Sequence, residues 1–235
     1  MTQNLRTPTY DQFLECRAVI IKAIATAWHD KRFLEDLEAR PVETLKERFG
    51  YDYPFKIALK VYPHSATWTP EINGGWTTVH KNKFTLVLPP APPKKEQHAI
   101  ALASYNANHI TSFGREFDTA VDNATPSLES MLEFQQVYLR AIALSWENKT
   151  FKEDLKKHPA DAFARYFDYR SPWLVEIEIV EHDDESAWDE DNSSWNLPLN
   201  TMTFGIPDHP KPGSEETVAL AAYSGAGQDY PFTCM

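Results

Sequence analysis

One stretch of the sequence occurs twice and decides the fold: AWHDKRFLEDLEARPVETLKERFG at residues 27–50 and SWENKTFKEDLKKHPADAFARYFD at residues 145–168. Trp28 and Trp146 are 118 residues apart. The same offset superimposes further positions: Phe33 on Phe151, Leu37 on Leu155, Pro41 on Pro159 and Phe49 on Phe167. Self-similarity at a fixed offset is the signature of duplicated structural units. We therefore expect two copies of one fold.

The similarity extends outward from these stretches on both sides. It reaches the segment Ala101-Leu102-Ala103-x-Tyr105, which falls on Ala219-Leu220-Ala221-x-Tyr223. The sequence therefore predicts a first repeat at residues 9–107 and a second at residues 127–225. A linker at 108–126 joins them, and a tail at 226–235 follows. Each repeat has the usual size of a small domain.

Each repeat begins with helical patterns and continues with alternating strands. Asp30 and Asn148 are good N-caps, and Pro41 and Pro159 suit the first position of the next helix. Alternating or apolar runs then predict strands at 56–61, 84–88, 174–179 and 202–206. This order predicts an α+β fold in which several helices precede a small antiparallel sheet in each repeat.

Tryptophans recur at equivalent positions of the two repeats. Trp28 and Trp146 lie on apolar helical faces, so we expect them in the core. Trp76 and Trp195 lie in the loop before the last strand of each repeat, where we expect an anchoring role. The same spacing also suits a binding site, but large aromatic side chains more often serve packing.

Charge and composition exclude several function classes. The net charge of −11 disfavours binding to nucleic acid or to anionic membranes. The N-terminal residues lack a secretory pattern and only two cysteines occur, so the cytoplasm is the expected compartment. Nucleophile, phosphate-loop and dinucleotide motifs are absent. We expect no catalytic residue, no cofactor and no enzymatic activity.

Metal-ligand motifs are also absent from the sequence. His64 and His182 are equivalent in the repeats, but neither has a second His or Cys at ligand spacing, so we expect structural or exposed roles. Residues 176–191 carry nine acids without the order of a calcium loop. This acidic segment is typical of a solvated face, and the alternative is a docking surface for a basic partner.

The tail carries reactive chemistry of another kind. Cys16 falls within the first amphipathic helix and is expected to be inert, whereas Cys234 follows Thr233 near the C-terminus. The sulfur of Cys234 can attack the carbonyl carbon of Thr233, and the hydroxyl of Thr233 can attack that of Phe232. Each attack closes a five-membered ring once an enzyme activates the amide oxygen.

The repeated pattern Trp-x-Asp/Asn-x-x-Phe-x-x-x-Leu-x-x-x-Pro, which starts at Trp28 and again at Trp146, resembles the helical signature of nitrile hydratase alpha subunits and their derived leader peptides. The cysteine cluster that holds the metal of those enzymes is missing here. The chain thus resembles the nitrile hydratase-like leader class of ribosomal natural product precursors. It is most similar to the two-chain thiazole/oxazole-modified microcin (TOMM) family, with both chains fused into one.

This resemblance implies a nitrile hydratase alpha-like fold and a bacteriocin-type function. The repeats would form a leader recognised by cyclodehydratase-type enzymes, and the tail would be a short core modified at Cys234 and Thr233. A leader peptidase or exporter would act at Gly225 and Ala226, after which a mature peptide would leave the cytoplasm. The alternative function is a non-catalytic binding or scaffold module.

Overall fold

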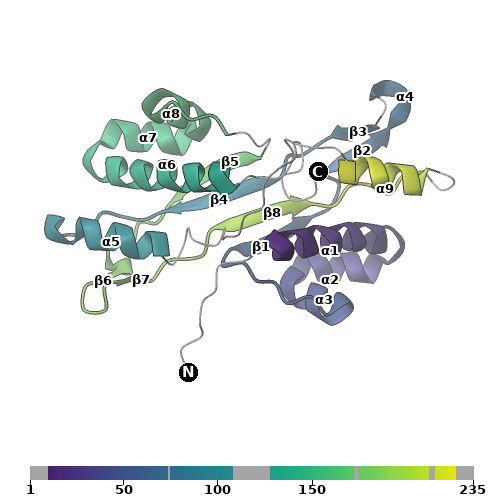
Figure 1. Ribbon diagram of the computed structural model, residues 1–235, viewed down its shortest axis with the longest axis horizontal. Coiled ribbons are helices and arrows are strands. Elements are labelled where there is room, and N and C mark those ends of the chain that lie inside the picture. The colour runs from purple at the N-terminus through teal and green to yellow at the C-terminus, as the bar shows by residue number, and fades with distance from the viewer. Residues whose placement is uncertain (1–9, 74, 108–127, 172–174, 212–214, 226–235) are drawn as a thin grey trace.

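The computed structural model describes residues 10–73, 75–107, 128–171, 175–211 and 215–225 (Figure 1). The expected linker at 108–126 and the whole tail at 226–235 therefore lie outside the described residues. Within the described ranges, no helix combines the length and apolar character needed to cross a bilayer.

Each repeat opens with three helices at equivalent positions. In the first repeat they are α1 (Tyr10–His29), α2 (Lys31–Ala39) and α3 (Pro41–Phe49). In the second they are α6 (Leu128–Glu147), α7 (Lys149–Lys157) and α8 (Pro159–Phe167). Corresponding helices begin and end 118 residues apart, as the sequence offset predicts.

Local capping fixes the boundaries between these helices. The carboxylate of Asp30 accepts a hydrogen bond from the backbone N–H of Phe33 at 3.0 Å, and the side chain of Asn148 accepts one from Phe151 at 2.9 Å. Each cap satisfies a backbone donor that the first helical turn leaves without an intrahelical acceptor. The predicted N-caps are therefore confirmed, as are the prolines that start α3 and α8.

Strands and short helices complete each repeat. The first repeat contributes β1 (Ala58–Tyr62), β2 (Ala66–Thr69), α4 (Pro70–Asn73), β3 (Gly75–Thr78), β4 (Lys83–Leu88), the 3₁₀ turn η1 (Lys95–Gln97) and α5 (His98–Tyr105). The second contributes β5 (Glu176–Glu181), the 3₁₀ turn η3 (Glu185–Ala187), β6 (Trp188–Asp189), β7 (Ser194–Trp195), β8 (Thr201–Gly205) and α9 (Glu216–Gly225).

The main sheet interleaves the strands of the two repeats. Its order is β1-β8-β4-β5, so β1 and β4 of the first repeat are separated by β8 of the second. The pairs β1–β8 and β4–β5 are parallel, and the central pair β4–β8 is antiparallel. Figure 1 shows β8 and β4 crossing the middle of the molecule between two groups of helices.

This topology corrects the expectation of a small antiparallel sheet in each repeat. Among the strands that the structure describes, only the short pairs β2–β3 and β6–β7 are antiparallel and local to one repeat. The main sheet is mixed because each repeat's first strand finds its parallel partner in the other repeat. The α+β class itself is confirmed.

The pairing has an approximate two-fold symmetry. Phe84 of β4 lies opposite Met202 of β8, and these two residues are equivalent in the sequence repeat. Ala58 pairs with Thr201 on one side of this point, and Lys83 pairs with Glu176 on the other. Ala58 is equivalent to Glu176, and Lys83 to Thr201, so the 118-residue offset converts one pair into the other. The two repeats therefore contribute equivalent strands to the sheet.

One core joins the two repeats. Helices α2 and α3 pack on β1, and α7 and α8 pack on β5. The fully buried side chains of Ile24, Leu37 and Leu86 belong to the same cluster as those of Ile142 and Leu155. Burying this apolar surface therefore couples the stability of both repeats.

Two buried asparagines stabilise the exchanged sheet. Asn82 accepts a hydrogen bond from the backbone N–H of Gly205 at 2.9 Å. Its counterpart Asn200 accepts one from the backbone N–H of Val87 at 2.8 Å. Each side chain thus satisfies a backbone donor of the other repeat, where an unpaired buried group would be costly.

Candidate functional site

The residues proposed for modification lie mostly outside the described part of the chain. Cys234, Thr233 and Ala226 belong to the tail beyond residue 225. Gly225, the other residue of the expected cleavage site, is the last residue of α9. The described element closest to this chemistry is therefore α9, from which the tail continues.

Residues of both repeats contact helix α9 along its length. The Tyr223 side chain is fully buried, and its hydroxyl donates to the backbone oxygen of Gly205 at 3.2 Å. The indole N–H of Trp76 donates to the backbone oxygen of Ala219 at 2.8 Å. The Trp76 ring also meets Tyr223 edge-on at 5.7 Å between centroids. Trp76 therefore has an anchoring role, but it lies in β3 rather than in the expected loop.

The first turn of α9 also contacts the first repeat. The indole N–H of Trp68 donates to the Glu215 carboxylate at 2.9 Å. Glu216 lies between two imidazoles, with its Oε2 2.9 Å from Nε2 of His29 and its Oε1 2.8 Å from Nε2 of His209. The hydrogen bond from His209 is the main cause that lowers the pKa of Glu216.

The same contacts recur around α5 with the repeats exchanged. The indole of Trp195 donates to the backbone oxygen of Ala101 at 2.8 Å, and that of Trp188 to Oε1 of Gln97 at 3.0 Å. The Tyr105 hydroxyl donates to the backbone oxygen of Val87 at 2.6 Å. Each last helix is therefore held by tryptophans of the other repeat, and Trp195 is an anchor as expected.

Trp28 and Trp146 differ from their expected place in the core. Both are half-buried, at equivalent positions. The indole N–H of Trp28 reaches the backbone oxygen of Pro207 at 2.9 Å, and that of Trp146 reaches Pro89 at 3.0 Å. An indole that donates to a loop of the other repeat has to lie at the edge of the apolar core. Trp28 and Trp146 therefore pack against the core and also link the two repeats through a hydrogen bond.

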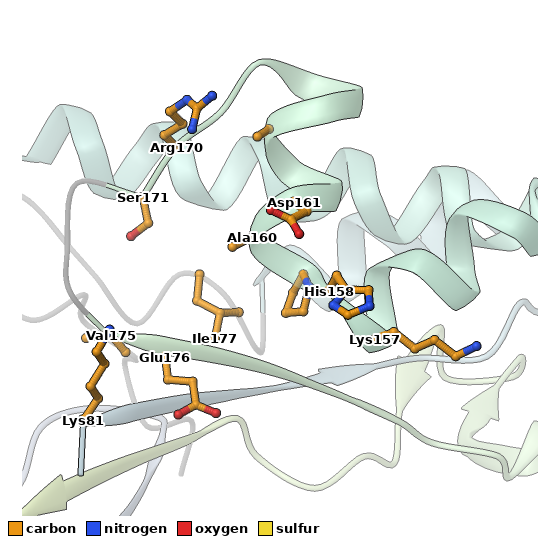
Figure 2. A pocket seen from close by; sticks show the side chains of 12 residues that line it. Lys81, Lys157, His158, Ala160, Asp161, Arg170, Ser171, Val175, Glu176 and Ile177 are labelled. Carbon is orange, nitrogen blue, oxygen red and sulfur yellow. The ribbon is translucent and has the colours of Figure 1, made fainter. Parts of the chain in front are cut away.

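A groove formed mainly by the second repeat, with Lys81 of the first, is lined by several basic side chains. It lies between the α7–α8 corner and β5, with a volume of about 760 Å³. Lys81 and Glu176 line one side, and Lys157, His158 and Asp161 line the other, with Arg170 at one end (Figure 2). Among the residues that the structure describes, none forms a salt bridge with Lys81, Lys157 or Arg170. The groove thus presents three basic side chains without salt bridges, beside the carboxylates of Asp161 and Glu176.

The first repeat does not have the same side chains at the positions equivalent to this groove. Ala39, Arg40 and Asp52 are equivalent to Lys157, His158 and Arg170. The equivalent of Lys157 is therefore uncharged, and that of Arg170 is acidic. The two halves share a backbone plan, but only one of them carries these basic side chains.

Acids of the 176–191 segment mostly have partners within the chain. Glu181 forms salt bridges with Lys152 and, at 2.6 Å, with Lys156. Burial acts to raise the pKa of Glu181, but the hydrogen bonds from both lysines outweigh it and keep the pKa below its ordinary value. Glu190 contacts Lys94 at 2.6 Å. Much of this segment therefore serves as a structural face, and its use as a docking surface is untested.

The remaining candidates have structural surroundings. Cys16 is buried, and burial raises the pKa of its thiol to about 11, so it stays protonated as expected of an inert side chain. His64 is exposed and its Nδ1 lies 2.5 Å from Oδ1 of Asp208. His182 donates its backbone N–H to the oxygen of Leu88 at 3.0 Å.

Sequence reasoning missed the grouping of His29, His209 and Glu216. Their three ligand-type atoms lie within 4.8 Å of one another. No local sequence motif predicts this cluster. His29 ends α1, whereas His209 precedes α9 and Glu216 begins it. Only the exchange of strands between the repeats brings them together.

Comparison with known proteins gives one match. A family model described as "Ribosomal natural product, two-chain TOMM family" matches residues 11–113 and again residues 129–231. No curated protein and no solved structure gives a significant match. The expected likeness to the nitrile hydratase alpha fold therefore stays a prediction.

Proposed function

Because the chain belongs to the ribosomal natural product, two-chain TOMM family, we propose that it is a peptide precursor and acts as a substrate rather than a catalyst. The observation that carries this proposal is the double match of the family model over both folded repeats. In this account the repeats form the leader, and residues 226–235 form the core.

The proposed modification is a cyclodehydration at the end of the tail. Sγ of Cys234 bonds to the carbonyl carbon of Thr233, the C–O bond of that carbonyl breaks, and a C=N bond forms to the nitrogen of Cys234. The oxygen leaves as water with the thiol proton and the amide proton, so no oxidant is needed. Thr233 can undergo the same reaction with the carbonyl of Phe232. A modifying enzyme of the cyclodehydratase type supplies the activation of the amide oxygen.

The length of the tail limits where that enzyme binds. Nine peptide units separate Gly225 from Cys234, and an extended chain gains at most about 3.5 Å per residue, or about 30 Å in all. Helix α9 is held by the buried side chain of Tyr223 just before the tail begins. The active site of the modifying enzyme must therefore lie within about 30 Å of the end of α9 when the leader is bound.

Cleavage between Gly225 and Ala226 suits the same arrangement. Gly225 ends α9, so a peptidase needs to unwind only the last turn to obtain an extended substrate. Tyr223, two residues earlier, remains anchored to Gly205. Cleavage would release the core and leave the folded leader intact, and an exporter would then carry the mature peptide out of the cytoplasm.

The basic groove is the proposed recognition surface for the modifying enzyme. Its exposed Lys157 and Arg170 suit an acidic segment of that partner. The double variant Lys157→Glu/Arg170→Glu should slow modification of the tail. Lys22→Glu/Arg32→Glu changes the net charge equally at exposed positions of the first repeat, and it should leave modification unchanged.

The cysteines provide the most selective test of the chemistry. When the chain is expressed with its modifying enzymes, its mass should fall by about 18 Da for each ring formed. Cys234→Ala should abolish the loss assigned to Cys234, whereas Cys16→Ala, which removes the buried thiol, should retain it. Equal modification of the Cys234→Ala variant would refute the assignment, and no mass change at all would favour the scaffold function.

A further inference from the structure

The cluster formed by His29, His209 and Glu216 is independent of the tail chemistry. His29 is the last residue of α1 in the first repeat, and Glu216 is the first residue of α9 in the second. His209 lies in the loop between β8 and α9. The cluster therefore crosses the boundary between the repeats at the base of the helix that leads into the tail.

The atoms that could bind a metal ion already point toward one another. Nε2 of His29 and Nε2 of His209 each approach a different oxygen of the same Glu216 carboxylate, at 2.9 and 2.8 Å. All three donor positions lie within 4.8 Å. Donors bound to one zinc ion at about 2.1 Å can be at most about 4.2 Å apart, so small rotations of these side chains are sufficient.

Solvent exposure leaves the His29 and Glu216 side chains room to rotate, and ring contacts hold His209 in place. The His29 side chain is 61% exposed, and that of Glu216 is 29% exposed. The His209 ring packs against the ring of Trp28 at 5.8 Å and against that of His29 at 5.1 Å between centroids. The two imidazoles are therefore positioned by an aromatic neighbour and by each other.

The chemistry of the donors selects the ion. Imidazole nitrogen and carboxylate oxygen together suit zinc, which prefers four donors in a tetrahedron.

We propose that His29, His209 and Glu216 form a Zn²⁺ site that clamps α9 of the second repeat to α1 of the first. The three side chains supply three donors, and the fourth tetrahedral position stays open to water. This inference does not rest on the proposed precursor function. It replaces the sequence-based expectation that the protein has no metal ligand.

The repeat supplies a comparison within the same chain. Glu147, Ala91 and His98 are equivalent to His29, His209 and Glu216. Because an alanine replaces one donor, the symmetry-related position has only two ligand-type side chains. We therefore expect one zinc ion per chain rather than two.

Isothermal titration of the full, untagged chain with ZnCl₂ tests the site. One ion should bind per chain with a dissociation constant of about 1 µM or lower, which is about 8 kcal/mol of binding free energy. His29→Ala and His209→Ala should each weaken binding by about 100-fold or more, because even losing a residue that supports a ligand costs 10–100-fold. Zinc should also raise the thermal unfolding midpoint of the wild type but not of His29→Ala.

A neighbouring histidine is the matched control. His64 is exposed and pairs with Asp208, next to His209 in sequence, but lies outside the cluster. Its φ of 60° is tolerated by Asn, so His64→Asn should keep the fold and bind zinc like the wild type. Wild-type affinity no higher than that of the His29→Ala/His209→Ala double variant would overturn the proposal. An equal loss of affinity in His64→Asn would overturn it too.

Discussion

Replacing Gly205 by Ala should strongly destabilise the protein, because Gly205 lies where strands of the two repeats meet. Gly205 ends β8 and pairs with Tyr62 of β1. A Cβ atom at this position would lie 2.1 Å from Cβ of Ser65, 2.7 Å from its Oγ and 2.8 Å from the hydroxyl oxygen of Tyr62. Ser65 is fully buried, so the backbone must move to make room.

The cost follows from two effects. Overpacking costs about 1–3 kcal/mol, and a shift of Gly205 also weakens its buried hydrogen bond to Asn82, which costs about 1–3 kcal/mol more. We expect Gly205→Ala to lower the free energy of unfolding by about 4 kcal/mol, as measured by urea denaturation with linear extrapolation. A decrease below about 1 kcal/mol would refute the close approach of β8 to the first repeat.

A second substitution identifies the contact responsible. Ser65→Gly removes two of the three close neighbours and leaves only the hydroxyl of Tyr62, at the end of its side chain. In the double variant Gly205→Ala/Ser65→Gly, part of the lost stability should return, with a coupling energy of about 2 kcal/mol. Strictly additive effects would mean that these residues do not touch and that the strand order is different.

Three further predictions concern the fold. Asp168 caps the end of α8 with a φ of 53°, and its counterpart Gly50 has a φ of 68°. Because glycine adopts a positive φ without steric cost, Asp168→Gly should raise the free energy of unfolding by about 0.5 kcal/mol. A lower free energy of unfolding in urea denaturation would contradict this. The lowered pKa of Glu181 adds stability that is present above its unfolded-state pKa and is lost as pH falls through its lower folded-state pKa. Glu181→Gln should therefore flatten the loss of stability in acid-denaturation curves, and unchanged curves would count against the ion pairs. The two halves of the chain, residues 1–113 and 114–235, should associate with each other or with a second copy of themselves when they are made separately. A half that is monomeric in ultracentrifugation and unfolds cooperatively in calorimetry would disprove the shared core.

Features fixed by neighbouring residues could be predicted from the sequence. Asp30 and Asn148 cap helices because a short polar side chain reaches the backbone N–H three residues later, which is a purely local contact. The 118-residue offset likewise predicted equivalent helices in both repeats. These signals need no knowledge of how the chain folds back on itself.

The strand order could not be predicted in this way. Alternation along residues 56–61 indicates which side chains face the core, but not which strand lies beside them. The exchange also explains why the role of Trp28 was misjudged, since the acceptor of its indole N–H is Pro207 of the other repeat. His29 and Glu216 meet for the same reason, although 187 residues separate them.

The central claim is that the C-terminal tail is the substrate of a modifying enzyme, and tandem mass spectrometry of that tail from producer cells tests it most directly. A proteolytic fragment that contains residues 226–235 should be lighter than its sequence by about 18 Da, or by about 36 Da if both rings form. Fragment ions should locate the first loss at the bond between Thr233 and Cys234. A tail of unmodified mass in cells that express the modifying enzymes would contradict this claim.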